Sequence, residues 1–339
     1  MNTKDLLREL TKSCGISGNE KPVAEAAASV LERFCETKRD NMGNLIGVIK
    51  GSGSGRKIML EAHMDQVGFI VTDIEDNGYI KFAAVGGVDP RILPGLRLKI
   101  FGSKTITGVV DVPDSPPEKT AQIKDMKIYT GYDADELRNL VRIGDHIAYD
   151  FDMTELLCGN LCSGAMDNRA GMAAILLALD MLKDKKLDAD IYALFSTQEE
   201  VGLRGSFTGA FEVKPDLAIV IDVTHGTTVD SENDSGVFDL GSGAVILRGP
   251  SVDYDKSLEL IDIAKENNIG YKIEAAGGAS GTTAWAIQTV GEGVPTLLIS
   301  IPLRYMHTNV ETLKLSDVEA AAALTAAAVE RFDSIAGEV

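Results

Sequence analysis

The chain has 339 residues, of which 45% are apolar and 25% are charged, and its net charge is −18. This composition indicates a globular protein with a large core and enough length for two domains. The negative charge argues against partners such as nucleic acid or an anionic membrane surface, because both would repel the chain.

The start of the chain predicts where the protein resides. Residues 1–10 carry charged side chains and no long apolar core, so they predict the beginning of an amphipathic helix rather than a signal peptide. The longest strongly apolar run, residues 172–179, is too short to cross a bilayer. The four cysteines suggest neither a disulfide framework nor a paired zinc site. We therefore expect a cytoplasmic protein.

The first part of the chain predicts two helices followed by two strands. Helical periodicity covers residues 3–13 and 20–34, and residues 44–50 and 57–62 have the composition of strands. The glycine-rich run 51–55 between the strands lacks the Gly-Lys-Ser/Thr ending of a phosphate loop. It therefore predicts a hairpin turn.

The pattern changes between residues 68 and 157. Short β-branched runs alternate there with Gly, Pro and Asp, and no long amphipathic helix appears. Residues 113–119 have the composition of an exposed loop. This segment predicts a small all-β domain inserted into another fold.

Helices and strands alternate after the insert. Helices are predicted at residues 167–182, 255–267 and 316–332, and strands at 191–196, 217–221, 244–247, 271–275 and 296–301. Alternation of this kind predicts an α/β fold, with a mixed central sheet and helices on both faces. The expected domains are therefore 1–67 plus 158–339, and the insert 68–157.

Two adjacent carboxylates follow the predicted strand 191–196. Glu199 and Glu200 would point in opposite directions if the chain stays extended, so one can bind a metal while the other stays free. Taken alone, such a pair is more simply explained as a solvated loop.

Residues of metal-binding type also follow other predicted strands or a loop. They are His63 and Asp65 after residues 58–62, Asp167 at a loop-to-helix junction, Asp222 after residues 218–221, and His307 after residues 297–301. Ligands in open α/β sheets gather beyond the carboxyl ends of the strands, so we expect these side chains to meet.

The chemistry of this set favours a pair of transition-metal ions. Imidazole together with carboxylate suits zinc, with cobalt or manganese as alternatives. The two histidines together with Asp167, Glu200 and Asp222 are too many ligands for one catalytic zinc but suit two ions that share a carboxylate. Asp65 lies two residues from His63 on the same face and can orient the imidazole by a hydrogen bond. Glu199 stays uncommitted and is the candidate general base.

Five segments resemble, in order and in local sequence, the M42 family of di-metal aminopeptidases. They are His63-Met64-Asp65, Asp167-Asn168-Arg169, Glu199-Glu200-Val201-Gly202, Asp222-Val223-Thr224 and Arg304-Tyr305-Met306-His307-Thr308. The resemblance extends over nearly the whole chain, and some relatives have been labelled glucanases.

The resemblance implies a role for each residue of the set. Asp167 would bridge two metal ions, with His63 and Asp222 on one ion and Glu200 and His307 on the other. Glu199 would be the base and Asp65 the orienting acid. The insert resembles the dimerisation domain of that family, whose members trim short peptides inside tetrahedral dodecamers. A homo-oligomer is therefore expected.

Three positions depart from the family pattern. Gln66 and Thr283 stand where the family has acids, and residues 116–118 keep only part of a Pro-Pro-His loop. None of these positions belongs to the five implied ligands. The departures therefore bear on substrate preference and assembly.

Several interpretations remain open at the level of sequence. The same metal centre could serve an amidase or deacylase acting on N-acyl amino acids, or a non-catalytic scaffold. A glucanase would need two free carboxyl groups, and most acids here are expected on metal. His225 is predicted near the site without binding metal. Gly277, Gly278 and Gly281 predict either a turn or a loop that contacts substrate.

Overall fold

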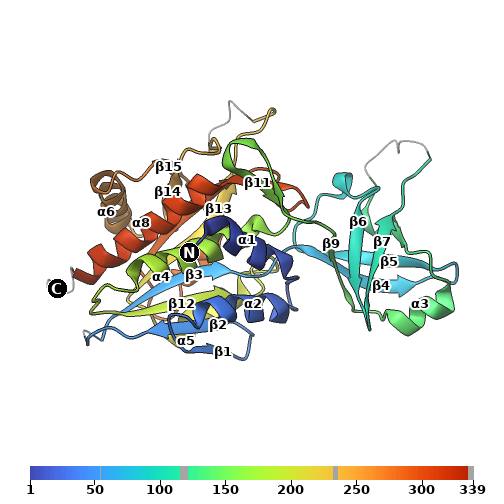
Figure 1. Cartoon of the computed structure of the whole chain (residues 1–339), viewed down its shortest axis with the longest axis horizontal. Helices are drawn as coiled ribbons and strands as arrows, with labels where there is room; N and C mark the ends of the chain where they lie inside the picture. Colours follow the sequence, from blue (N-terminus) through green and yellow to red (C-terminus); the bar gives the residue numbers. More distant parts are fainter. Residues whose placement is uncertain (54, 115–120, 232–235, 335–339) are drawn as a thin grey trace.

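Figure 1 shows the protein as a computed structural model, which describes residues 1–53, 55–114, 121–231 and 236–334. A large α/β domain occupies one end of the long axis and a small β-barrel occupies the other. This arrangement confirms the predicted fold class. None of the helices in the described ranges is long and apolar enough to cross a membrane.

The α/β domain is built on an eight-stranded sheet. Its strands, in spatial order, are β1 (Thr37–Arg39), β2 (Leu45–Ile49), β12 (Asp190–Ser196), β3 (Lys57–His63), β13 (Leu217–His225), β16 (Thr296–Leu303), β14 (Ala244–Arg248) and β15 (Tyr271–Ala275). The four central strands are mutually parallel, whereas β2 and β14 run antiparallel to their neighbours β12 and β16. The sheet is therefore mixed, and its parallel centre aligns the strand ends that carry the candidate ligands.

Helices cover both faces of this sheet. On one face, inward residues such as Ile58 and Ile221 share a core with α1 (Thr3–Lys12), α2 (Lys21–Leu31), α4 (Met166–Leu182), α6 (Tyr254–Glu266) and α8 (Leu315–Ser334). On the other face, Met59 and Leu194 pack in a core with residues of α5 (Arg204–Val213) and α7 (Ala284–Ile287). Helix α4 is apolar on nearly every side because it is enclosed between the sheet and other helices.

The predicted hairpin between β2 and β3 is wrong. Strand β12 lies between them, antiparallel to β2 and parallel to β3. The turn residues predict a reversal of the chain, and the two strands do run in opposite directions. Lys50, at the end of β2, donates to Asp190, at the start of β12, which is 140 residues later in the chain. Local sequence cannot show that so distant a strand inserts between β2 and β3.

The inserted segment forms a closed antiparallel barrel. In spatial order its strands are β4 (Gly68–Ile74), β5 (Tyr79–Val85), β8 (Lys127–Tyr129), β7 (Thr105–Val110), β6 (Arg97–Phe101) and β9 (His146–Tyr149). The predicted all-β character missed a short helix, α3 (Ala134–Leu140), and two 3-10 turns (Pro90–Ile92 and Ile123–Asp125). All six strands fall within residues 68–157. The Pro-Pro segment 116–118 lies outside the described residues.

A small three-stranded sheet joins the barrel to the α/β domain. It consists of β10 (Thr154–Glu155), β11 (Asn160–Ser163) and β17 (Glu311–Lys314), with the 3-10 turn Leu157–Gly159 between the first two strands. Ser163 pairs with Glu311 in this sheet. The pairing brings Glu311 within hydrogen-bond distance of the beginning of α4, where Asp167 lies.

Candidate metal centre

The structure brings the candidate residues together at one edge of the sheet. One cavity of about 200 Å³ is lined by six of the seven, namely His63, Asp167, Glu199, Glu200, Asp222 and His307. Asp65 lies behind this cavity and is fully buried. The convergence follows from the parallel centre of the sheet, which presents the ends of β3, β12, β13 and β16 on the same side.

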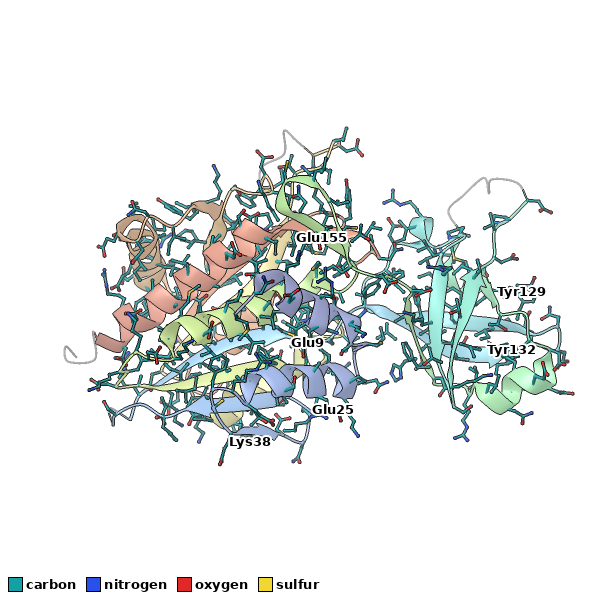
Figure 2. The ribbon with its side chains drawn as sticks, in the orientation of Figure 1. Glu9, Glu25, Lys38, Tyr129, Tyr132 and Glu155 are labelled. Carbon is teal, nitrogen blue, oxygen red and sulfur yellow. The ribbon has the colours of Figure 1, made fainter. Side chains whose placement is uncertain are left out.

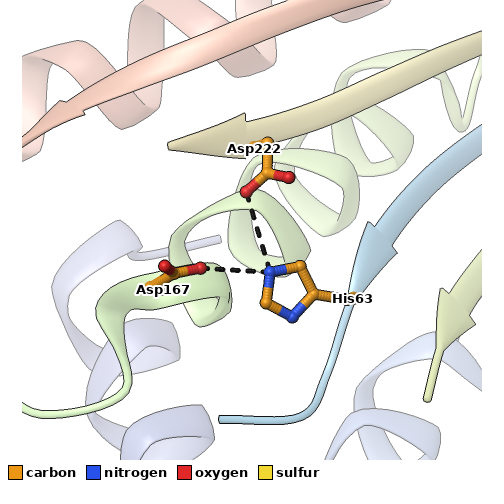
Figure 3. Close-up of side chains that lie close together, drawn as sticks. All are labelled: His63, Asp167 and Asp222. Carbon is orange, nitrogen blue, oxygen red and sulfur yellow. Dashed lines mark ion pairs between the residues drawn. The ribbon is translucent and has the colours of Figure 1, made fainter. Parts of the chain in front are cut away.

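Asp167 lies between the two histidines. Its Oδ1 is 3.0 Å from Nε2 of His63, and its Oδ2 is 3.4 Å from Nε2 of His307. Asp222 Oδ1 approaches the same nitrogen of His63 at 3.7 Å, and Glu200 Oε2 approaches that of His307 at 3.3 Å. Figure 3 shows His63 with its two acids. Each oxygen of Asp167 thus belongs to a different three-residue group.

The beginning of α4 is fixed by the residue after Asp167. Asn168 donates from Nδ2 to the carbonyl of Ile221 at 2.8 Å and accepts from the backbone N–H of Gly171 at 2.9 Å. The Asp167–Asn168 peptide bond is cis. Because Ile221 immediately precedes Asp222 on β13, this bond holds the two acids in a fixed relation.

Two groups of side chains fit a divalent ion. His63, Asp167 and Asp222 form one, and Asp167, Glu200 and His307 form the other, with the donor atoms of each group within 4.8 Å of one another. Oδ1 of Asp167 is buried and has no hydrogen-bond partner, so an acceptor there is free to bind a cation. Mixed imidazole and carboxylate donors suit zinc and similar ions.

The orientation of both imidazoles supports this assignment. Nδ1 of His63 donates to the carbonyl of Asp65 at 3.1 Å, and Nδ1 of His307 donates to the carbonyl of Gly87 at 2.7 Å. A carbonyl can only accept, so each Nδ1 carries a proton and each Nε2 is left to bind a cation.

The electrostatics of the site demand positive charge between these groups. Burial alone would lower the pKa of His307, but Asp167 and Glu200 raise it to about 11. Burial likewise opposes the charge on His63, whereas three carboxylates raise its pKa well above the usual value. The acids would thus hold protons on both rings unless a metal ion takes their place.

Glu199 lies beside the two groups without belonging to either. Burial, together with the nearby acids Asp222, Glu200 and Asp167, raises its pKa to about 9, although His63 has the opposite effect. A carboxyl group in this environment can act as a base near neutral pH only when cations neutralise the surrounding acids.

Asp65 supports the loop that carries both glutamates. Its carboxylate accepts from the backbone N–H of Glu199 at 2.9 Å, from that of Glu200 at 3.2 Å and from the hydroxyl of Ser17 at 2.6 Å. Its Oδ1 is 3.6 Å from Nδ1 of His63, so the closer contact of that nitrogen is with the backbone carbonyl. The acid therefore positions the loop as well as lying beside the ring.

Sequence analysis missed a further buried acid, Glu311. Its two oxygens accept from the backbone N–H of His307 at 2.8 Å and from that of Asp167 at 3.1 Å. These bonds tie two candidate ligands from distant parts of the chain to one side chain. No motif marks Glu311, because its role arises only when β17 pairs with β11.

The barrel segment also reaches the site. Besides the bond from His307 to Gly87, the hydroxyl of Tyr149 donates to the backbone carbonyl of His307 at 3.3 Å. Both partners belong to the predicted insert. The insert therefore contributes to the position of His307.

Thr283 and Gln66, the two departures from the family pattern that lie in the described ranges, both make hydrogen bonds with buried side chains. Thr283 donates its hydroxyl to Glu61, a fully buried acid that also accepts from Ser196 at 2.6 Å. A buried acid on β3 therefore lies against Thr283. Gln66 accepts from Nη2 of the buried Arg169 at 3.2 Å, so a neutral amide faces this guanidinium.

Two further predictions concern the wall of the cavity. His225 lines the cavity, as the sequence predicts, and the expectation that it binds no metal stays a prediction. Gly281 also lines it, together with Ser280 and Thr282. This favours the loop that contacts substrate over a simple turn.

Comparisons with known proteins agree with this architecture. The sequence model of the M42 glutamyl aminopeptidase family matches residues 43–324. A lysyl aminopeptidase of Pyrococcus furiosus is 32% identical over 97% of this chain and 97% of its own length.

Solved structures with the same fold are also peptidases. An aminopeptidase of Desulfurococcus kamchatkensis, APDkam598, has a TM-score of 0.91 and 32% identity, covering 97% of this chain and 94% of that one. The TET1 peptidase of Pyrococcus horikoshii, which can assemble into a tetrahedron or a large octahedral shell, has a TM-score of 0.86 and 29% identity, covering 96% and 98%.

Proposed function

Because this chain belongs to the M42 family of aminopeptidases, we propose that it removes the N-terminal residue of short peptides with water activated at two divalent metal ions. One observation supports this proposal most directly. Asp167 presents one oxygen to His63 and the other to His307, and the uncommitted Glu199 lines the same cavity.

We assign the metal ligands by these contacts. His63 and Asp222 would hold one ion, Glu200 and His307 the other, and Asp167 both. Ions bound there would polarise the scissile carbonyl and lower the pKa of water. Zinc is the first candidate for this donor set, with cobalt and manganese as alternatives.

The protein's own residues would perform the proton transfers. Glu199 takes a proton from the attacking water and delivers it to the leaving amine. Asp65 holds the backbone N–H of Glu199, so the base keeps a fixed position while its proton moves. Glu311 holds the backbone of Asp167 and His307 in the same way.

Further features belong to the same proposal. The barrel, residues 68–157, would serve as the dimerisation domain of a homo-oligomer, for which the assembling TET1 relative is the precedent. The protein would act in the cytoplasm. The peptidase names of the relatives support peptides as substrates rather than N-acyl amino acids.

The proposal is tested with a panel of aminoacyl p-nitroanilides, whose hydrolysis releases p-nitroaniline, and of N-acetyl amino acids, whose hydrolysis releases acetate. The protein is treated with a chelator and reloaded separately with Zn²⁺, Co²⁺ and Mn²⁺. The lysyl relative makes lysine the first residue to try. We expect hydrolysis of the free-amine substrates only, lost with the chelator and restored by metal. Activity confined to the acetylated substrates would instead indicate a deacylase.

A further inference from the structure

One acid in the cavity has no part in the proposed chemistry. Glu274, on the edge strand β15, lines the same cavity as the candidate metal ligands and is half-buried. Its Oε2 accepts from the hydroxyl of Thr224 at 3.0 Å. Thr224 follows Asp222 by two residues on β13, so both point to the same face, about 6.6 Å apart along the strand. Glu274 therefore lies roughly one side-chain length from the proposed metals.

The charge on Glu274 is poorly compensated. Among the described residues that line the cavity there is no lysine or arginine. The only positively chargeable group that acts on Glu274 within the described chain is His225, and burial is the larger influence, raising the pKa of Glu274. An acid that is removed from water without a cationic partner favours a ligand that brings one.

The wall between the two ends of the cavity is apolar. Leu247 and Leu298 line it, and their strands β14 and β16 lie between β15 and β13 in the sheet. Leu247 pairs with Glu274, so the two side chains share a face. The cavity, about 200 Å³, is smaller than typical sites for drug-sized ligands, about 300–1,000 Å³, and suits a single amino-acid side chain.

We infer that Glu274 selects substrates whose N-terminal residue is basic. The methylene stem of a lysine or arginine would lie on Leu247 and Leu298, and its cationic end would meet the carboxylate of Glu274. This inference rests on the proposed aminopeptidase function and adds the substrate class to it. A substrate with an acidic N-terminal residue would be repelled at the same point.

The test compares lysyl and norleucyl p-nitroanilides, because norleucine has a similar stem without the amine. In the wild-type protein we expect kcat/KM to be higher for lysine by about ten- to a hundredfold, the range for a charge-assisted hydrogen bond. Glu274→Gln keeps the size and the acceptor for Thr224, and it should bring this ratio close to one. Glu292→Gln is the matched control, since Glu292 is exposed in the turn before β16, away from the cavity.

Three results would contradict the inference. Equal rates on the two substrates in the wild-type protein would overturn it, as would a ratio that Glu274→Gln leaves unchanged. An equal loss on both substrates in Glu274→Gln would indicate contact with the α-ammonium group, which also overturns side-chain selection. In these cases the aminopeptidase itself stands. Failure to hydrolyse any aminoacyl substrate with any metal would overturn the proposed function and this inference together.

Discussion

In the proposed mechanism, Asp167 is the ligand shared by two metal ions and Glu199 is the acid that binds neither. Asp167 has its two oxygens directed at different histidines, which leaves no oxygen for proton transfer. Glu199 is positioned by its backbone, through Asp65, and its carboxyl group is left to move protons. The neighbouring Glu200 instead has its carboxylate 3.3 Å from Nε2 of His307. The two adjacent glutamates therefore have different proposed roles.

Replacement of Glu199 by glutamine should separate metal binding from turnover. The amide cannot accept the proton of water, so we expect kcat to fall by about 10²–10⁴-fold while the bound metal is retained. Metal content by elemental analysis and kcat on a lysyl substrate are the two measurements. Glu25→Gln, on the exposed face of α2 (Figure 2), is the control for loss of one carboxylate. Full activity in the Glu199 variant would reject its role as base.

Glu61 should make the stability of the chelated protein depend on pH. Burial raises its pKa from 4.5 to about 7, despite hydrogen bonds from Ser196 and Thr283. Because the folded-state pKa is the higher one, its contribution to stability is fully present below about pH 4.5 and is lost as the pH rises through about 7. The loss between pH 5.5 and 8 is about 2 kcal/mol.

The measurement is urea unfolding of wild-type protein and Glu61→Gln in chelator. The variant lacks this titration, so its unfolding free energy should not show the loss that the wild type shows as the pH rises. The unfolding free energy of the variant minus that of the wild type should therefore increase with pH. A difference between the two proteins that stays constant from pH 5.5 to 8 would contradict the assignment.

At the level of elements, the barrel and the sheet meet at His307. The loop after β16 carries this residue, yet the contacts that orient it come from Gly87 and Tyr149 of the inserted barrel and from Glu311 on β17. The insert is therefore part of the support of the site. Changes to the barrel residues that contact His307 are expected to alter metal binding at the site.

Tyr149→Phe tests this coupling. The variant loses the bond to the carbonyl of His307, worth about 0.5–1.5 kcal/mol, so the affinity for the metal held by His307 and Glu200 should fall by about two- to tenfold. Metal titration of the chelated protein measures this. Tyr129→Phe, with its ring on the barrel away from the α/β domain (Figure 2), should leave the affinity unchanged. Equal metal affinities in the two variants would show that the contact between Tyr149 and His307 does not support metal binding.

At the level of the whole molecule, the outer surface of the barrel is the candidate contact for assembly. Tyr129 pairs with Tyr79 on one side and with Val109 on the other, so three apolar side chains form a row across β5, β8 and β7. Tyr129 is 54% exposed and Val109 39%. Single exposed apolar residues are ordinary, but a contiguous row marks a surface for interaction.

We expect the protein to run as a homo-oligomer in a sizing experiment with light scattering. Val109→Asp places a charge at one end of the apolar row, beside Tyr129, and should shift the distribution toward the monomer. Val229→Asp is the matched control, because Val229 is 92% exposed on the α/β domain. An unchanged mass in Val109→Asp would exclude this row as the contact.

The sequence by itself determined the kind of fold and the candidate residues of the site. Alternation of helical and extended patterns requires only local periodicity, and it correctly predicted a mixed sheet covered on both faces with a β insert. His63, Glu200 and Asp222 could be named as candidates because the parallel strands before them end at one edge whatever their order.

The tertiary structure alone decided how these residues are supported. Three features depend on contacts between distant segments. They are the strand order that separates β2 from β3, the hydrogen bond from the backbone of Asp167 to Glu311 across 144 residues, and the hydrogen bond from Thr224 to Glu274. Such contacts leave no periodic or local pattern, because the free energy that fixes them comes from burial and pairing between distant segments.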